Sequence, residues 1–462
     1  MKKYDIIVIG CGASGVFIAN EFTKNNIDAN VLIIDKGKII EERLCPINIK
    51  KVERCISCNP CDIMNGYGGA GTLSDGKYNI TNNFGGDLFK YIGPKEAISL
   101  MEYVDSVLCE YDGHTAPLYS TTNSDLKTTA LRHDLHLLDA KVRHFGTDRN
   151  IRILKHIYNY TKDKIDMIFN TEAREIEKKN DEFIVKTNKG IFTSNDLVLA
   201  TGRSGSRWLA DICKNFDIKT YSNQVDIGVR VELPAEIFKH ITDEVYESKI
   251  VYLTSKYNDL VRTFCMNPYG HVVAENTNGI ITVNGHAYSN KELQTENTNF
   301  ALLVSNRFTE PFKDSNDYGE SIARLSNMLG GGVLLQRFGD LVKGRRSSER
   351  RMEKCFTRPT LKATPGDLSL VIPKRQLDSI IEMIYALDKI APGTANNDTL
   401  LYGVEVKFYN SKIEVDENLQ TRIENLYAIG DGSGVTHSLS QASASGVHVA
   451  RRLIEKYGTI EA

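Results

Sequence analysis

Four cysteines lie close together near the N-terminus, with a spacing that suits redox or metal chemistry. Cys45, Cys55, Cys58 and Cys61 follow the pattern C-x9-C-x2-C-x2-C. Two C-x2-C steps wrap a short loop round one centre, and the more distant cysteine can close a fourth position, which suits a 4Fe-4S cluster. Tetrahedral zinc, a catalytic dithiol–disulfide pair and idle thiols are the alternatives. The cluster is the preferred prediction, with all four cysteines as its metal ligands.

A second group of residues has the spacing of a dinucleotide-binding turn. Gly10, Gly12 and Gly15 form G-x-G-x-x-G between an expected strand and an expected helix. The first glycine allows the tight turn, the second lets the backbone approach a pyrophosphate, and the third lets helix and strand pack closely. Asp35 ends the next strand about 20 residues further on, where a carboxylate can bind ribose hydroxyls. The register of these parts favours nucleotide binding over a chance glycine turn.

Two later segments favour FAD over NAD. One strand ends in Thr201-Gly202, and another ends in Gly430-Asp431 ahead of a helix. Both resemble segments of the glutathione-reductase-like flavoproteins, and the resemblance implies that Asp431 binds the ribityl chain or the pyrophosphate. The helix that follows would direct its N-terminus at negative charge on the reduced flavin. The other interpretation of Asp431 is a cap for that helix.

No second glycine motif with an acidic partner follows Thr201-Gly202, so NADH and NADPH are expected to be poor reductants. A domain inserted after this point is therefore expected to bind substrate, as in the succinate-dehydrogenase-like branch. The stretch from Gly66 to Gly71 is expected to lie along the cofactor toward the isoalloxazine ring, as in related flavoproteins. The predicted FAD-binding residues are Gly10, Gly12, Ala13, Ser14, Gly15, Asp35, Lys36, Gly68, Gly69, Ala70, Gly71, Ser74, Asp75, Lys77, Ala173, Thr201, Gly202, Gly430, Asp431, Ser440, Gln441 and Ala442.

Four further residues are candidates for catalysis. Cys265 follows a strand-like stretch and precedes a bend, so it is either a reactive thiol or a packed one. Glu405 and Lys407 share one face of a strand and could form an ion pair or act as acid and base, or lie on the surface as a pair. His286 could exchange a proton near pH 7, although a lone histidine can also be structural.

The overall charge and composition exclude several classes of protein. The formal net charge is −2, which argues against a nucleic-acid binder and a basic membrane-surface protein. No apolar run approaches the length of a membrane span, and the N-terminus lacks the features of a signal peptide. Nine cysteines in 462 residues are too few for a disulfide scaffold. A reducing cytoplasmic location is therefore expected. The expected partners are a small-molecule substrate and an electron-transfer protein. A basic run forms either a solvated face or a site for an anionic substrate or acidic partner, and it comprises Lys343, Arg345, Arg346, Arg350 and Arg351.

The elements that position these residues predict an α/β fold. A Rossmann-like FAD-binding domain of discontinuous segments is expected at 1–210 and 395–462, with a cysteine-rich functional loop at 36–93 and an inserted mixed α+β substrate domain at 211–394. The expected helices are 13–23, 94–111, 124–140, 148–163, 375–387 and 441–456. The expected strands are 5–9, 31–34, 165–169, 172–176, 183–186, 197–200 and 426–429.

Longer motifs resemble a family of FAD-dependent dehydrogenases. They are Gly66-Tyr-Gly-Gly-Ala-Gly-Thr-Leu-Ser-Asp-Gly-Lys77, Arg143-His-Phe-Gly-Thr-Asp148, Gly228-Val-Arg-Val-Glu232, Phe264-Cys-Met-Asn-Pro-Tyr-Gly270, Leu401-Tyr-Gly-Val-Glu-Val-Lys-Phe408 and Gly430-Asp-Gly-Ser-Gly-Val-Thr436. One departure is His437, where relatives are expected to carry arginine. The resemblance implies FAD and redox chemistry without naming a substrate. The rival hypotheses are a cluster-free dehydrogenase with a thiol relay and a non-redox FAD-binding RNA-modification or structural protein.

Overall fold

The computed structural model describes residues 2–460 apart from 47–48, 50, 53–55, 57, 123–124, 246–247, 278, 289, 309–311 and 313. The chain forms two compact units. Unit 1 comprises Met1–Leu118, Val142–Asn223 and Asn410–Ala462, and unit 2 comprises Tyr119–Lys141 and Gln224–Tyr409. The predicted domain boundaries at 210/211 and 394/395 are therefore displaced, and the sequence did not indicate that 119–141 belongs to the second unit.

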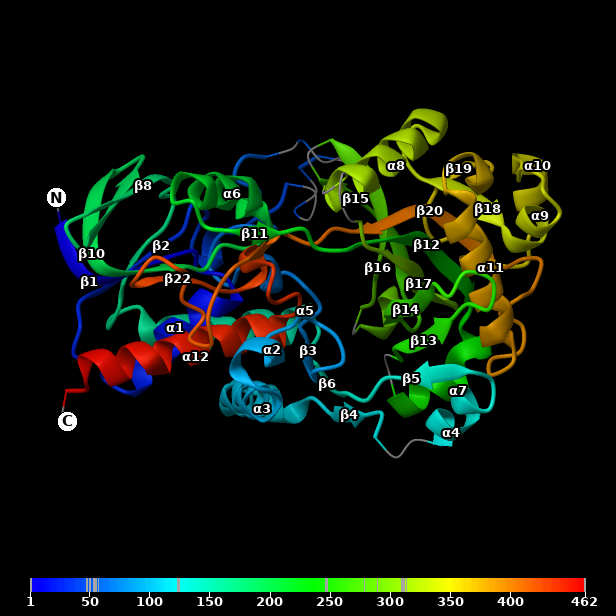
Figure 1. Cartoon of the computed structure of the whole chain (residues 1–462). Coiled ribbons are helices and arrows are strands. Elements are labelled where there is room, and N and C mark those ends of the chain that lie inside the picture. Colours follow the sequence, from blue (N-terminus) through cyan, green and yellow to red (C-terminus); the bar gives the residue numbers. More distant parts are fainter. Residues whose placement is uncertain are drawn as a thin grey trace. The chain divides into compact units, whose positions relative to one another are not determined.

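Unit 1 is built on a seven-stranded sheet in the order β7-β2-β1-β10-β9-β8, with β22 pairing the end of β10 (Figure 1). The strands β7, β2, β1, β10 and β22 are parallel, and β10-β9-β8 form an antiparallel meander. The strand bounds are β1 Lys2–Ile9, β2 Val31–Ile34, β7 Asp166–Ile168, β8 Ala173–Lys179, β9 Glu182–Thr187, β10 Gly190–Leu199 and β22 Leu426–Ala428. A parallel strand–helix–strand unit at the centre of such a sheet is the Rossmann-like arrangement.

Both faces of this sheet are covered, as the near-continuous apolar sequences of its central strands require. On β1, Ile6 and Val8 face one core, while Ile7 and Ile9 face another. The first core is formed with α1 Ala13–Lys24, α3 Pro94–Glu110, α5 Thr147–Thr161 and α12 Leu439–Tyr457, and the second with α6 Ser206–Asn215. The remaining elements of this part of the chain are α2 Phe89–Ile92, β3 Lys77–Ile80, β4 Leu118–Ser120, β6 Lys141–His144, β11 Thr220–Tyr221 and β21 Lys412–Ile413.

Helices α1 and α12 lie together on one side of the sheet (Figure 1). Gly446 has no side chain, so the two backbones can approach closely. A Cβ at Gly446 would lie only 2.3 Å from the carbonyl oxygen of Ser14. Helix α12 therefore carries the C-terminal part of the chain back to the glycine turn at the start of α1.

Unit 2 is built on an eight-stranded, mostly antiparallel sheet in the order β19-β18-β20-β12-β17-β14-β13-β5. The strand bounds are β5 Leu135–Leu137, β12 Val225–Pro234, β13 Ile250–Leu253, β14 Leu260–Asn267, β17 Asn297–Asn306, β18 Leu334–Arg337, β19 Thr364–Pro365 and β20 Leu400–Lys407, and a separate hairpin is formed by β15 His271–Thr277 and β16 Ile280–His286. The helices are α4 Asp125–Leu131, α7 Ala235–Val245, α8 Ser315–Gly330, α9 Phe338–Val342, α10 Glu349–Met352 and α11 Lys374–Asp388.

The central strand β12 separates an apolar layer from a charged one. Val225, Ile227, Val229 and Val231 alternate into the core formed with the helices. The residues between them include Asp226, Arg230 and Glu232, which are all 0 % exposed. Buried charges are costly unless they are paired and hydrogen-bonded, so the charged layer of this sheet is the part of unit 2 where chemistry is expected.

The predicted helices agree with the structure except for one that was predicted too long. The helix expected at 124–140 ends at Leu131, because Asp134 has φ +59° and Leu135–Leu137 pairs with β13 instead. The other expected helices are present within a few residues of their predicted ends. No helix in the described ranges is long and apolar enough to cross a membrane.

Candidate functional site

The glycine turn between β1 and α1 has the geometry of a phosphate-binding loop. Gly10 has φ +108°, and a Cβ there would lie 2.5 Å from the carbonyl oxygen of Ala200. A Cβ on Gly15 would lie 2.2 Å from the carbonyl oxygen of Gly10. Gly12 differs, because nothing lies within 4 Å of the position its Cβ would occupy. This open backbone at the N-terminus of α1 can receive a pyrophosphate.

Asp35 binds three backbone segments around this turn. Its carboxylate accepts hydrogen bonds from the backbone N–H groups of Cys11 at 2.8 Å, Gly37 at 2.7 Å and Gly66 at 2.9 Å. A carboxylate offers about four lone-pair sites, so one further donor can be accepted. The predicted ribose contact stays a prediction, and the structure adds a second role for Asp35 as the junction of three loops.

The glycine-rich stretch 66–71 lies along the phosphate-binding turn. The backbone N–H of Gly68 donates to the carbonyl oxygen of Cys11 at 2.7 Å, and Gly68 forms a parallel bridge with Gly12. The predicted residues Gly69, Ala70 and Gly71 continue as a single helical turn. The stretch therefore lies beside the turn, and its course along a bound cofactor stays a prediction.

Arg43 fixes this stretch from the cysteine-rich side, and no sequence motif indicates this role. Its guanidinium is buried, and burial lowers the pKa of Arg43 to about 10, although nearby carboxylates oppose that effect. It donates to four backbone carbonyl oxygens, those of Asp62, Ile63, Tyr67 and Gly69. No spacing rule marks an arginine that binds only carbonyl groups.

The two later flavin motifs meet the same turn. A Cβ on Gly432 would lie 2.0 Å from the carbonyl oxygen of Thr201, and a Cβ on Gly430 would lie 2.5 Å from Ser14 Oγ. The carboxylate of Asp431 accepts a hydrogen bond from Thr436 Oγ1 at 2.9 Å. The structure thus brings the Gly430 segment and the Thr201 segment to the N-terminus of α1, and their contact with a flavin stays a prediction.

We call the space over Gly12 and Gly202, bordered by the Gly66–Gly71 stretch, the cofactor groove, and buried polar atoms beside it fit a dinucleotide. Thr201 Oγ1 and Ser440 Oγ are buried, and neither has a hydrogen-bond partner in the described part of the chain. Together with the open space over Gly12 and Gly202, they leave donors and acceptors that a bound dinucleotide can satisfy.

Other predicted cofactor residues have different partners. Gln441 Nε2 donates to the carbonyl oxygens of Thr81 and Phe84, so its side chain holds the 81–88 loop. Lys36 Nζ lies 3.5 Å from the carbonyl oxygen of Ser204. The residues Ala13, Gly202, Ala173 and Ala442 lie at the start of α1, at the end of β10, at the start of β8 and in α12.

The cysteine cluster is not gathered round a common point in the described residues. Cys45, Cys58 and Cys61 are free and half-buried, while Cys55 lies outside the described ranges. Among the residues that are described, no group of three or more His, Cys, Asp or Glu side chains is arranged to hold a metal ion. The predicted iron–sulfur site is therefore not supported by the part of the loop that the structure describes.

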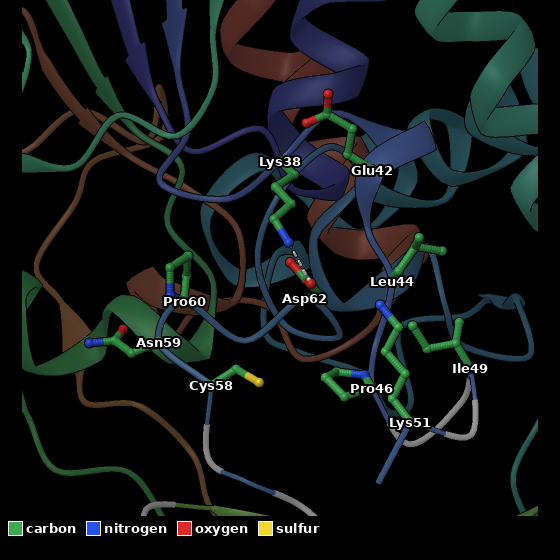
Figure 2. A pocket seen from close by; sticks show the side chains of 10 residues that line it. All are labelled: Lys38, Glu42, Leu44, Pro46, Ile49, Lys51, Cys58, Asn59, Pro60 and Asp62. Carbon is green, nitrogen blue, oxygen red and sulfur yellow. Dashed lines mark hydrogen bonds and ion pairs between the residues drawn. The ribbon is translucent and has the colours of Figure 1, made fainter.

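A cavity of about 470 Å³ opens beside this loop (Figure 2). Lys38 and Asp62 form an ion pair of 2.8 Å within it, and Asp62 Oδ1 is buried with no hydrogen-bond partner among the described residues. The remaining lining residues are Glu42, Leu44, Pro46, Ile49, Lys51, Cys58, Asn59 and Pro60. Cys58 is the cysteine that faces this space.

In unit 2, Arg230 organises the charged layer of the sheet. It is 0 % exposed and donates to Glu405 from Nε at 2.7 Å and from Nη2 at 2.5 Å. It also donates to the carbonyl oxygen of Cys265 at 2.8 Å and to the side-chain oxygens of Asn284 at 2.9 Å and Asn299 at 3.3 Å. These contacts use all five guanidinium N–H groups, so Arg230 positions its neighbours and has no donor left for a substrate.

Cys265 is held by this network in a strained conformation. It has φ +46°, which is rare outside glycine, and its carbonyl oxygen also accepts from Asn267 Nδ2 at 2.9 Å. Such strain costs about 1–3 kcal/mol and persists where the surroundings enforce it, often at functional sites. The thiol is free and half-exposed, so it remains a candidate for chemistry.

The other predicted catalytic residues lie near Arg230. Lys407 Nζ is 3.7 Å from the ring centroid of Phe264, the residue before Cys265. His286 packs edge-on against Tyr288 with ring centroids 4.6 Å apart, two positions beyond Asn284 in β16. The carboxylate of Glu405, which the sequence grouped with Lys407, is bound instead by Arg230.

The basic run in unit 2 is partly an internal ion-pair network. Asp340 is 0 % exposed and lies 2.8 Å from Arg345 Nε and 3.9 Å from Arg351 Nε. Arg337, outside the run, also lies 3.5 Å from this carboxylate. An anionic ligand or acidic partner for Lys343, Arg346 and Arg350, which are exposed, stays a prediction.

The ionisation of Glu405 predicts a pH dependence of stability. Burial raises the pKa of Glu405 to about 7, and the Arg230 charge opposes this shift. A folded-state pKa above the unfolded value near 4.3 means that the folded protein binds the proton more tightly. The free energy of unfolding of unit 2 should therefore fall by about 2 kcal/mol as the pH rises from 5 to 8. Denaturant melts across this range should show the slope in the wild type and lose it in Glu405→Gln, whereas Glu424→Gln, at an exposed site, should keep it.

Comparison with known proteins adds a family match to these observations. Residues 224–408 match a family model described as "FAD-dependent protein, C-terminal domain-like". The match covers nearly all of the larger segment of unit 2 and leaves unit 1 outside it. Over residues 224–408 the chain is therefore similar to FAD-dependent proteins.

Other similar proteins align with most of the chain. A protein from Clostridium beijerinckii described as uncharacterized is 24 % identical over 475 residues, which span 98 % of this chain and 81 % of the relative. Glycine oxidase from Geobacillus kaustophilus aligns with a TM-score of 0.42 at 12 % identity, over 100 % of this chain and 97 % of that one. L-proline dehydrogenase from P. horikoshii aligns with a TM-score of 0.42 at 16 % identity, over 99 % and 95 %. At these values the likenesses assign no substrate.

Proposed function

We propose that this protein is an FAD-dependent oxidoreductase that moves electrons between its flavin and an organic small molecule. The observation that carries the proposal is the open backbone of Gly12 at the N-terminus of α1, bordered by the Gly66–Gly71 stretch and by Asp35. The match of unit 2 to FAD-dependent proteins supports the same cofactor independently of unit 1.

The flavin would supply a two-electron acceptor for a hydride. The backbone around Gly12 and the N-terminus of α1 would bind its pyrophosphate, and Asp35 would bind its ribose. The N-terminus of α12, which begins after the cap residue Ser438, would stabilise negative charge at the ring. In unit 2, Cys265 and Glu405 of the charged layer around Arg230 are candidate reactive groups.

The first test concerns retention of the cofactor. We expect the purified protein to carry about one FAD per chain, and Asp35→Ala to lose most of it. The reason is that three backbone N–H groups from the turn and the glycine-rich stretch lose their common acceptor. Flavin released by heat would be measured against protein. Asp166→Ala, at a carboxylate that is 55 % exposed in the same sheet, should retain FAD. Full occupancy in Asp35→Ala would remove the assignment of the site.

The spacing of the four cysteines also supports a second proposal, a 4Fe-4S cluster that passes single electrons to or from the flavin and on to an electron-transfer protein. Thiolate ligation at C-x2-C-x2-C spacing is typical of such clusters. The competing proposal is a cluster-free enzyme whose cysteines act as a thiol relay.

Iron analysis distinguishes these two proposals. Protein purified or reconstituted without oxygen should contain about four irons per chain, with a broad absorption beneath the flavin bands and a paramagnetic signal on reduction. Cys58→Ser should lower the iron content and leave FAD in place, whereas Cys213→Ser, at a buried cysteine in α6, should change neither. Iron-free anaerobic protein with full FAD would favour the thiol relay.

A further inference from the structure

The glycine-rich stretch gives the cofactor groove a direction. The backbone N–H of Gly66 donates to Asp35 at 2.9 Å, and Gly68 bridges the phosphate-binding turn. At Gly71, a Cβ would lie 2.7 Å from the side chain of Leu439, the first residue of α12. The stretch therefore runs from the ribose carboxylate, past the pyrophosphate turn, to the helix expected to face the flavin ring. The residues after Gly71 lie at the ring end of the groove.

Three charged or titratable side chains gather just beyond that end. Lys77 Nζ lies 3.2 Å from Asp75 Oδ2, and His144 Nε2 lies 3.6 Å from the same oxygen. The side chains of Lys77, His144 and Asp75 are only 10 %, 12 % and 18 % exposed. Burial alone would raise the pKa of Asp75, but the Lys77 ammonium and the contact with His144 hold it below its usual range. Asp75 is therefore a carboxylate near neutral pH, and it anchors the other two groups.

The backbone fixes this cluster to the end of the glycine-rich stretch. The N–H of Gly146 donates to the carbonyl oxygen of Asp75 at 2.9 Å, which joins the segment before β3 to the segment after β6. Asn150, in the first turn of α5, donates from Nδ2 to the carbonyl oxygen of Gly71 at 2.8 Å. The side chains of the cluster thus have a defined position relative to the groove within unit 1.

The face of β3 that carries Lys77 also carries a buried polar atom that awaits a partner. Lys77 and Asn79 alternate with Tyr78 and Ile80, which belong to the apolar core. Asn79 Oδ1 is buried without a hydrogen-bond partner among the described residues. A buried polar atom normally has a partner, so Asn79 indicates a ligand on this face.

We propose that Lys77, held by Asp75 and His144, is the cation that stabilises the negative charge of the reduced flavin. This inference rests on the proposed function. When bound, the flavin would accept the hydrogen and both electrons of the C–H bond of a substrate R₂CH–XH and would then carry one negative charge. His144 would take the X–H proton on its imidazole as the carbon–X double bond forms. An ammonium group at the flavin favours the charged product.

Opposite charge changes in the cluster should move the flavin potential in opposite directions. Lys77→Met removes the cation, so the equilibrium constant for two-electron reduction should fall about tenfold, which corresponds to a midpoint potential about 30 mV more negative. Asp75→Asn leaves the cation and removes its counter-charge, so the potential should become more positive. Lys77→Arg, which keeps the charge, should stay close to the wild type. Midpoint potentials would be measured by dye-coupled reduction of the purified, FAD-loaded protein.

A surface lysine provides the control. Lys90 is 54 % exposed and pairs with Asp87 at 3.0 Å, so Lys90→Met removes an equivalent ion pair from unit 1 and should not change the potential. FAD-loaded Lys77→Met with the wild-type potential would overturn the inference, as would a negative shift in Asp75→Asn. If Lys77→Met does not fold, the sign of the shift in the near-isosteric Asp75→Asn decides the question. Wild-type protein that binds no FAD would instead refute the proposed function.

Discussion

Gly12→Asp should abolish FAD binding while leaving the protein folded. Nothing lies within 4 Å of the position that a Cβ on Gly12 would occupy, so the side chain itself causes no clash. It would fill the space that a pyrophosphate needs and would place a carboxylate against the phosphates at the N-terminus of α1. We expect FAD content to fall at least tenfold, with far-ultraviolet circular dichroism unchanged and the flavin bands absent from the purified protein.

Two further variants separate charge from bulk. Gly12→Ala adds only a methyl group in the same place and should weaken FAD binding less than Gly12→Asp. Gly331→Asp, at the C-terminal end of α8 in unit 2, also has open space and a φ of +64° that aspartate tolerates, so it should keep full FAD. FAD-replete Gly12→Asp would show that the cofactor does not pass over this turn.

Arg230→Met should be among the most destabilising single changes in unit 2. It removes the cation from a pair in which Arg230 is 0 % and Glu405 7 % exposed at the side chain. The carboxylate of Glu405 loses its arginine donor, and the carbonyl oxygen of Cys265 loses one of its two donors. Breaking a buried pair from one side costs about 3–5 kcal/mol. Hydrogen exchange of the β12 amides and the melting temperature would both report the loss.

The control for this prediction removes an arginine from an exposed pair. Arg324 is 63 % exposed and bonds Glu320 at 3.2 Å within α8, so Arg324→Met should cost well under about 1 kcal/mol. The double variant Arg230→Met/Glu405→Leu removes both charges and should recover much of the lost stability. An unchanged melting temperature in Arg230→Met would contradict the central role of this pair.

The sequence predicted the elements around the candidate site where the signal was local. The turn at Gly10, Gly12 and Gly15 depends on a few consecutive residues, and the structure has β2 at 31–34, the bounds that the sequence predicted. Helix 124–140 was predicted too long because its last part pairs with β13, more than a hundred residues away. Local periodicity does not register such a long-range partner.

The role of Asp35 as the junction of three loops is also a long-range feature that local sequence signals do not predict. The distance of Asp35 from the glycine turn predicts that it is a ribose ligand. The contact of Asp35 with Gly66, which is 31 residues further on, depends instead on how the chain between them folds back. Arg43 is a clearer case, because its partners are backbone carbonyl oxygens, which every residue possesses.

The sequence by itself determined the glycine turn and the buried parallel strands beside it, because these depend on glycines whose backbone freedom is local and on strands whose apolar runs are continuous. Only the tertiary structure decided which charges are buried and paired. Arg230 and Glu405 are 175 residues apart in the chain and share one bidentate contact because β12 and β20 are neighbours in the sheet. Burial and pairing are properties of the folded chain. The contacts of Asp75 with Lys77 and His144 were therefore also decided by the tertiary structure.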